Sequence, residues 1–133
     1  MAALDLAEMA RRHGIRLLLQ FGSTVSGGVH ERSDLDLGLV LDDPSLSLGR
    51  YADLHADLHA LFPGRKIDMA VLNHADPLFL KQVTDRCRLL HGSEAELQRL
   101  KLYAFKRYQD HRKYLDLEHR FVARAIAASV PRG

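Results

Sequence analysis

The chain has 133 residues and a mass of 15.0 kDa, which is the size of one domain. Apolar residues make up 47% of the sequence and charged residues 27%, a composition that excludes a collagen, a low-complexity tail and a chain too polar to collapse. The formal net charge is +2, too small for a dedicated nucleic-acid binder, and no apolar run reaches the length that spans a bilayer.

Compartment is suggested by the N-terminus and by the cysteine content. The first residues contain Asp5 and Glu8 but no basic segment or cleavage signal, so we expect no secretory signal. The single cysteine, Cys87, cannot form a disulfide within the chain. The sequence is compatible with a reducing environment, and we predict a cytoplasmic protein.

Hydrophobic periodicity, together with the glycine and proline positions, predicts helices and strands in alternation. Glycine- and serine-rich residues 22–32 are expected to form a loop, and Ser93 with Glu96 forms a capping box before a long helix. The apolar stripe of that helix breaks near His111. In chain order, the predicted elements are helix 4–12, strand 15–21, strand 34–41, helix 48–62, strand 66–72, helix 76–85, strand 88–91 and the helix after Ser93.

This order predicts an α/β fold: a small mixed sheet of about four strands with flanking helices and a long C-terminal helix. We expect residues 1–92 to form the core. Residues 93–133 would be a helical extension packed on that core within the same domain.

Two aspartates on the second predicted strand carry the strongest functional signal. Phe21, Gly22 and Ser23 end one strand in a turn, and Asp34 and Asp36 lie on the next strand, two residues apart and therefore on one face. Two carboxylates this close repel each other, and their neighbours are apolar, so a cation between them is expected. Mg²⁺ is suited to this role because it binds one or two carboxylates and completes its shell with phosphate oxygens and water.

A third acid, Asp68, interrupts the apolar strand 66–72. If this strand neighbours the second, three acids would hold two metal ions beside a nucleoside triphosphate. The turn at Gly22 and Ser23 would supply backbone N–H groups and a hydroxyl to the phosphates.

The spacing from Gly22-Ser23 to Asp34 and Asp36 resembles the signature of the DNA polymerase beta-like nucleotidyltransferase superfamily. The short chain, the segment 68–77 and the segment 88–91 are similar to its minimal nucleotidyltransferase (MNT) branch, specifically the MntA-type antitoxins. The resemblance covers residues 15–122. It implies the polymerase beta-like fold and an antitoxin that transfers AMP from ATP to a tyrosine hydroxyl of a partner HEPN-domain RNase toxin.

Carried over by position, the resemblance implies that Gly22 and Ser23 bind the triphosphate of ATP and that Asp34 and Asp36 bind metal. Asp68 completes the triad and helps to deprotonate the attacking hydroxyl. Thr24 stands where many relatives have arginine. The basic residues available to replace it near the phosphates are Arg32, Arg65 and Lys66.

Two alternative functions stay open at this stage. One is the same chemistry on a small-molecule acceptor such as an aminoglycoside, although the chain lacks room for a second, acceptor-binding domain. The other is a module that neutralises its toxin by binding alone, which Thr24 favours. His55 and His59 have metal-ligand spacing but no evident third ligand. The basic and aromatic residues between Lys101 and Tyr114 fit either a partner surface or core packing.

Overall fold

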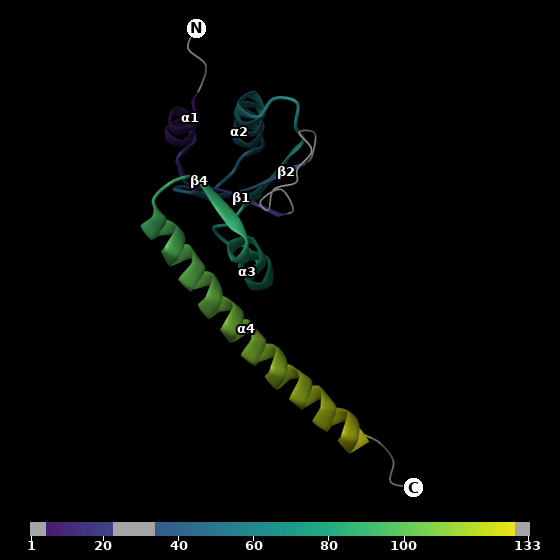
Figure 1. Cartoon of the computed structure of the whole chain (residues 1–133). Helices are drawn as coiled ribbons and strands as arrows, with labels where there is room; N and C mark the ends of the chain where they lie inside the picture. The colour runs from purple at the N-terminus through teal and green to yellow at the C-terminus, as the bar shows by residue number, and fades with distance from the viewer. Residues whose placement is uncertain (1–4, 23–33, 130–133) are drawn as a thin grey trace.

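The computed structural model describes residues 5–22 and 34–129. A four-stranded sheet in the order β3-β2-β1-β4 lies at its centre, with α1 and α2 on one side, α3 on the other, and α4 running away from the sheet (Figure 1). The elements are α1 Leu6–His13, β1 Ile15–Phe21, β2 Leu35–Leu41, α2 Leu48–Leu61, β3 Ile67–Val71, α3 Pro77–Asp85, β4 Cys87–His91 and α4 Glu94–Ser129. The predicted α/β fold with a mixed sheet is confirmed.

The sheet is mixed because its central strands pair in different ways. β1 is antiparallel to β2 and to β4, whereas β2 is parallel to β3, which it reaches through α2. Alternate residues of a strand face opposite sides, so β2 sends Leu35, Leu37 and Leu39 into the core beneath α1 and α2. Val40 belongs to the second core, together with Leu80 and Val83 of α3. Asp36 shares the parity of Val40 and therefore lies on the α3 side.

Most predicted boundaries are confirmed to within a residue or two. The strand 15–21 is as predicted, because Gly14 and Gly22 at its two ends adopt positive φ. The first helix begins at Leu6 and not at residue 4, because Asp5 is its N-cap and accepts a hydrogen bond from the Glu8 N–H at 2.7 Å. Apart from Gly22, the predicted loop 22–32 lies outside the described residues.

The end of the sheet where β1 begins and β2 ends is covered by paired charges. His13 Nε2 lies within hydrogen-bond distance of Oδ2 of Asp57, at 2.6 Å, and this contact joins α1 to α2. Arg12 forms an ion pair with the same oxygen at 3.5 Å. Arg50 donates to the carbonyl oxygens of Asp43, Ser45 and His13 at 2.8, 2.8 and 3.1 Å. We call this group the basal cluster; its acids are Asp42, Asp43 and Asp57, and their partners are Arg12, Arg16, Arg50 and the His13 ring.

The long helix α4 has two different halves. Its start is capped by Ser93, whose hydroxyl accepts from the Glu96 N–H at 3.1 Å, and its first turns bury Leu97 and Ala104 beside α3. The backbone stays helical past His111, because residues 94–129 contain no glycine or proline. Burial ends there: residues 112–129 are all exposed, and this half projects beyond the rest of the molecule (Figure 1). Within the described part of the chain, no helix has the length and apolarity needed to cross a membrane.

Candidate active site

The candidate site lies at the end of the sheet opposite the basal cluster, where β1 ends and where β2 and β3 begin. Gly22 follows β1 with φ +82°, in the left-handed region that favours glycine. A Cβ added at this position would collide with Oδ2 of Asp36. The backbone turn and the carboxylate are therefore in direct contact, as the predicted turn beside two acids requires.

A single row of side chains crosses the sheet at this end. Asp68 of β3 pairs in register with Asp36 of β2, Asp36 with Phe21 of β1, and Phe21 with Cys87 of β4. Residues paired in register lie on the same face, about 4.5–5.5 Å apart between Cβ atoms. The row thus places two carboxylates side by side, with an aromatic ring next to them, on the face that carries α3.

The electrostatics of the row agree with the expected repulsion. The pKa of Asp36 is raised above its usual value, first by burial and then by the nearby charges of Asp68 and Asp34. Asp36 is half-buried, whereas Asp34 and Asp68 are exposed. Asp34 and Asp68 therefore both act electrostatically on Asp36, and each makes its ionised form less favourable.

The donor chemistry of this group fits Mg²⁺. Carboxylate oxygens are the ligands this ion takes, and a cation would relieve the repulsion that raises the pKa of Asp36. Within residues 5–22 and 34–129, however, no three side chains of His, Cys, Asp or Glu are already arranged to hold one ion together. Asp34 and Asp68 are exposed and would have to turn toward Asp36 to share a metal.

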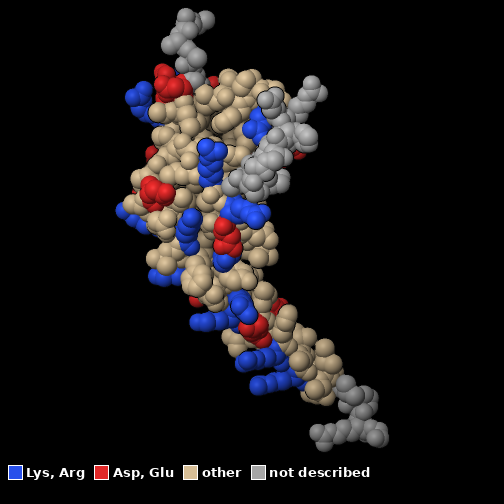
Figure 2. Space-filling view, in the orientation of Figure 1, with Lys and Arg blue, Asp and Glu red and all other residues tan. Residues whose placement is uncertain are grey.

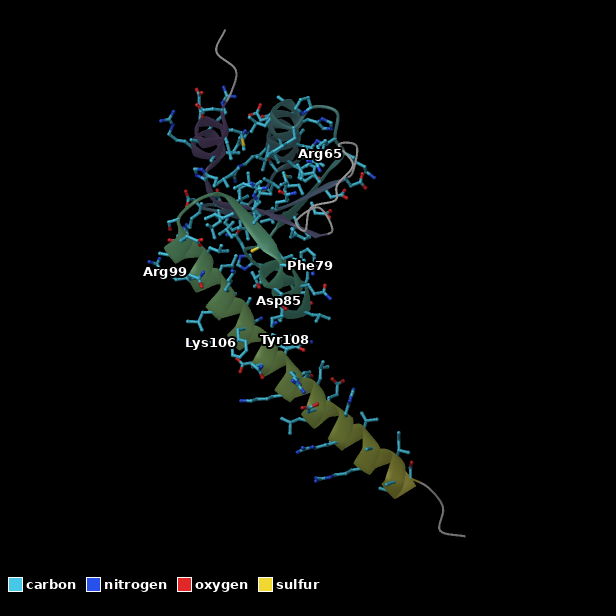
Figure 3. All side chains as sticks on the ribbon, in the orientation of Figure 1. Arg65, Phe79, Asp85, Arg99, Lys106 and Tyr108 are labelled. Carbon is cyan, nitrogen blue, oxygen red and sulfur yellow. The ribbon has the colours of Figure 1, made fainter. Side chains whose placement is uncertain are left out.

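The remaining predicted phosphate ligands fall into two groups. Ser23, Thr24 and Arg32 lie outside the described residues. Arg65 and Lys66 directly precede β3, and the Lys66 carbonyl accepts from the Leu35 N–H at 2.8 Å, so this segment borders the site (Figure 3).

The histidine pair of α2 lies on the other face of the sheet. The rings of His55 and His59 have centroids 5.5 Å apart, and Nε2 of His55 is 3.4 Å from the Ile67 carbonyl oxygen. This contact gives His55 a structural role at the β3 edge.

Cys87 ends the row but is not an activated nucleophile. Burial, with a smaller contribution from Glu94, raises the pKa of its thiol despite the opposing effect of Lys101. Its Sγ lies 3.7 Å from the Thr84 carbonyl oxygen, to which the thiol donates. A protonated, half-buried thiol packs as a small apolar side chain, in agreement with the sequence-based interpretation.

A cavity of about 320 Å³ adjoins Gly22 and was not apparent in the sequence. Its walls come from the end of β1 and from α3, and are formed by Phe21, Gly22, Phe79, Gln82, Val83 and Arg86. The antiparallel register of β1 with β2 places Phe21 on the face of Asp36. Nothing in the sequence pattern, however, indicates that the Phe79 ring meets it edge-on, with centroids 5.8 Å apart.

Comparison with known families identifies the class of this site. The family described as "Polymerase beta, Nucleotidyltransferase" matches residues 5–96, which include β1, β2 and β3 with their acids. The chain therefore belongs to the polymerase beta nucleotidyltransferase family. Among functionally curated proteins, a sequence search finds no significant match.

Several solved structures similar to this chain are toxin–antitoxin complexes. A mutant of the toxin–antitoxin MntA–HpeT superposes with a TM-score of 0.68 at 18% identity, covering 96% of this chain and 99% of that one. A toxin–antitoxin with AMP-PNP gives 0.68 at 20% identity, with 92% and 95% covered. A tri-AMPylated Shewanella oneidensis HEPN toxin in complex with MNT antitoxin gives 0.63 at 18% identity, with 92% of each chain covered.

Proposed function

We propose that this protein is an antitoxin that transfers AMP from ATP to a tyrosine hydroxyl of a partner HEPN toxin. The observation that carries the proposal is the in-register pair of Asp36 and Asp68 beside Gly22, in a chain of the nucleotidyltransferase family. Two similar structures support the proposal: one contains AMP-PNP, and the other contains a tri-AMPylated HEPN toxin. The reducing cytoplasm, compatible with a single cysteine, is the compartment we propose.

In the proposed reaction the tyrosine oxygen attacks the α-phosphorus of ATP. The bond from this phosphorus to the bridging oxygen of the β-phosphate breaks, and pyrophosphate leaves with the electron pair. We expect Asp68, which is exposed on the edge strand β3, to accept the hydroxyl proton. Gly22 lets the backbone approach the triphosphate closely, and Ser23 follows it in the chain.

Asp34, Asp36 and Asp68 are the residues that would hold Mg²⁺, with two ions as the family resemblance implies. When bound, the metal would neutralise charge on the triphosphate and lower the pKa of the attacking hydroxyl. The half-buried Asp36 is the central ligand in this arrangement, because Asp34 and Asp68 both raise its pKa.

The exposed half of α4 is the surface we propose for the toxin. Taken as a functional division, residues 1–92 would be the catalytic core and residues 93–133 the helical extension that meets the partner. Figure 2 shows Lys and Arg side chains along one edge of this helix. Its exposed large apolar side chains include Tyr114, Leu115, Leu117, Phe121, Val122 and Ile126. Aromatic and basic residues on one helix are typical of protein interfaces.

Two tyrosines of α4 allow the proposed toxin interface to be tested separately from packing within the chain. Tyr114 is 63% exposed, whereas Tyr108 is half-buried, with Nζ of Lys81 5.4 Å from its ring centroid. We expect Tyr114→Ala to weaken toxin binding by roughly thirtyfold with an unchanged melting temperature. Tyr108→Ala should lower the melting temperature, because it removes packing between α3 and α4. A stable Tyr114→Ala variant that retains full toxin binding would place the interface elsewhere.

Transfer itself is tested with α-labelled ATP, Mg²⁺ and a HEPN toxin as the acceptor. Label should appear on the toxin with the wild-type protein, and should be lost with a chelator or with Asp36→Asn. Asp53→Asn is the matched control, since it changes an exposed aspartate on α2 away from the site.

The alternatives give different results in the same assay. Toxin neutralised without any label would indicate a module that acts by binding alone. Label transferred to an aminoglycoside and not to the toxin would indicate a small-molecule acceptor. Full labelling by Asp36→Asn would contradict the assigned site.

A further inference from the structure

We propose that the cavity between the end of β1 and α3 binds the purine base of the nucleotide. This inference rests on the proposed function and adds to it the part of the substrate that the acidic row does not explain. The carboxylates and the glycine turn account for metal and phosphates, but they offer nothing to a base. The cavity adjoins the same turn at Gly22 and holds about 320 Å³.

The row across the sheet sets the order of subsites. Asp68, Asp36 and Phe21 lie on three successive strands, each about 4.8 Å from the next. An α-phosphate held near Asp36 therefore has Asp68, the proposed proton acceptor, on one side and the Phe21 ring on the other. The acceptor hydroxyl must approach on the Asp68 side, which leaves the cavity on the β1 side for the nucleoside.

The cavity walls suit a flat aromatic ring. Phe21 and Phe79 meet edge to face, with an interplanar angle of 83°, and Phe79 lies between α3 and the sheet (Figure 3). A planar base against this wall contacts the face of one ring and the edge of the other, both favourable geometries. Val83, which is buried, lines the apolar side of the cavity.

The polar residues at the rim distinguish a purine from a tyrosine ring. Gln82 and Arg86 are exposed, and within the described residues neither side chain forms a hydrogen bond or an ion pair. The Gln82 amide offers a donor and an acceptor side by side, which match the paired polar atoms on a purine edge. The Arg86 guanidinium can stack on a base. A tyrosine ring has a single polar atom, which must lie at the phosphate and would leave both side chains without a partner.

The test is equilibrium binding to the full chain with Mg²⁺, comparing α,β-methylene-ATP with inorganic tripolyphosphate. We expect Phe79→Leu to weaken binding of the ATP analogue by about tenfold, because a stacking ring is lost while apolar volume is kept. Gln82→Ala should narrow the preference for α,β-methylene-ATP over α,β-methylene-CTP. Tripolyphosphate binding should stay within about twofold of wild type for both variants, since its contacts are elsewhere.

Matched controls are Phe62→Leu and Gln98→Ala. Phe62 is partly buried against the other face of the sheet, and Gln98 is exposed on α4. Neither control should change the affinity for the ATP analogue.

Each outcome separates this inference from the proposed function. If the wild-type protein binds both ligands and the affinities are unchanged in Phe79→Leu and Gln82→Ala, the purine site is wrong. The proposed transferase function would not be affected by that result. An equal loss of both ligands in Phe79→Leu would also overturn it, because the effect would then be on the phosphates. A wild-type chain that binds neither ligand would overturn both proposals.

Discussion

Aspartate side chains at the two ends of the central sheet have opposite electrostatic surroundings. At the basal cluster each aspartate pairs with an arginine: Asp42 with Arg16 at 3.1 Å, Asp57 with Arg12 at 3.5 Å, and Asp43 with Arg50 at 3.9 Å. Asp57 also lies 2.6 Å from Nε2 of His13. The pKa of Asp57 is lowered there, first by its hydrogen bond with His13. At the other end, the pKa of Asp36 is raised by burial and by two more acids.

This difference separates structural carboxylates from those expected to bind a ligand. A paired aspartate holds α1 against α2 and needs nothing from outside the chain. At the other end, Asp34 and Asp68 disfavour the ionised form of Asp36, which is the arrangement expected where a cationic ligand binds. The contrast can be tested one residue at a time.

The largest effect is expected from Asp36→Asn. Loss of the central carboxylate should lower AMP transfer by about a thousandfold or more, since several kcal/mol of transition-state stabilisation depend on the metal it would hold. The metal-free variant should melt at the same temperature as wild type or higher, because like-charge repulsion is relieved. Label transfer and thermal melting measure the two effects; an active or strongly destabilised variant would contradict the comparison.

Asp68→Ala should have the next largest effect, on turnover. A general base contributes about 10²–10⁴-fold to rate, so kcat should fall by that order while ATP affinity changes far less. Steady-state kinetics combined with direct ATP binding would show the split. If ATP binding alone is lost, Asp68 is a nucleotide ligand and not the base.

At the basal cluster, Asp57→Ala should affect stability and not transfer. It leaves the buried His13 ring without its partner, at a cost of about 1–3 kcal/mol in the free energy of unfolding. Urea unfolding and the labelling assay would be run on the same preparation. Asp53→Ala, also on α2 but exposed, is the control. A loss of transfer without a loss of stability would show that the two ends are coupled.

The smallest effect is expected in the pH dependence of stability, which should have opposite signs for Asp57 and Asp36. It is measured as the free energy of unfolding in the presence of a chelator. The stability contributed by Asp57 is present above its usual pKa and is lost as the pH falls through its lowered folded value. Asp36 acts in reverse: stability is highest below its usual pKa and declines as the pH rises through its raised value. Wild type should therefore gain stability relative to Asp57→Asn as the pH rises toward about 4, and should lose stability relative to Asp36→Asn as the pH rises further above about 4. Slopes of the same sign would contradict the contrast.

Much of the fold could be predicted because the residues that begin and end its helices and strands act locally. Gly14 and Gly22 delimit β1, and Asp76 followed by Pro77 starts α3 where the sequence indicates, with Asp76 accepting from the Leu78 and Phe79 N–H groups. The period of a strand also predicts a shared face for Asp34 and Asp36, but Asp34 lies one residue before β2, so this stays a prediction. These features depend on residues only a few positions apart.

The rest depends on pairings between distant segments. His13 and Asp57 are 44 residues apart, and no periodicity relates them. The alignment of Asp68 with Asp36 requires the parallel register of β2 and β3, which the sequence could state only as a condition. The contact of Phe79 with Phe21 depends on how α3 lies against the sheet. Three-dimensional packing fixes each of these, and the site is built from them.

The uneven burial of α4 has a consequence for motion. Residues 112–129 extend about 27 Å, at 1.5 Å per residue, and an exposed helix of that length is only marginally stable in water. In the free chain, the amide hydrogens of this half will exchange with solvent far faster than those of the sheet. A partner that lies along the helix would slow this exchange, and part of its binding energy would be used to order the helix.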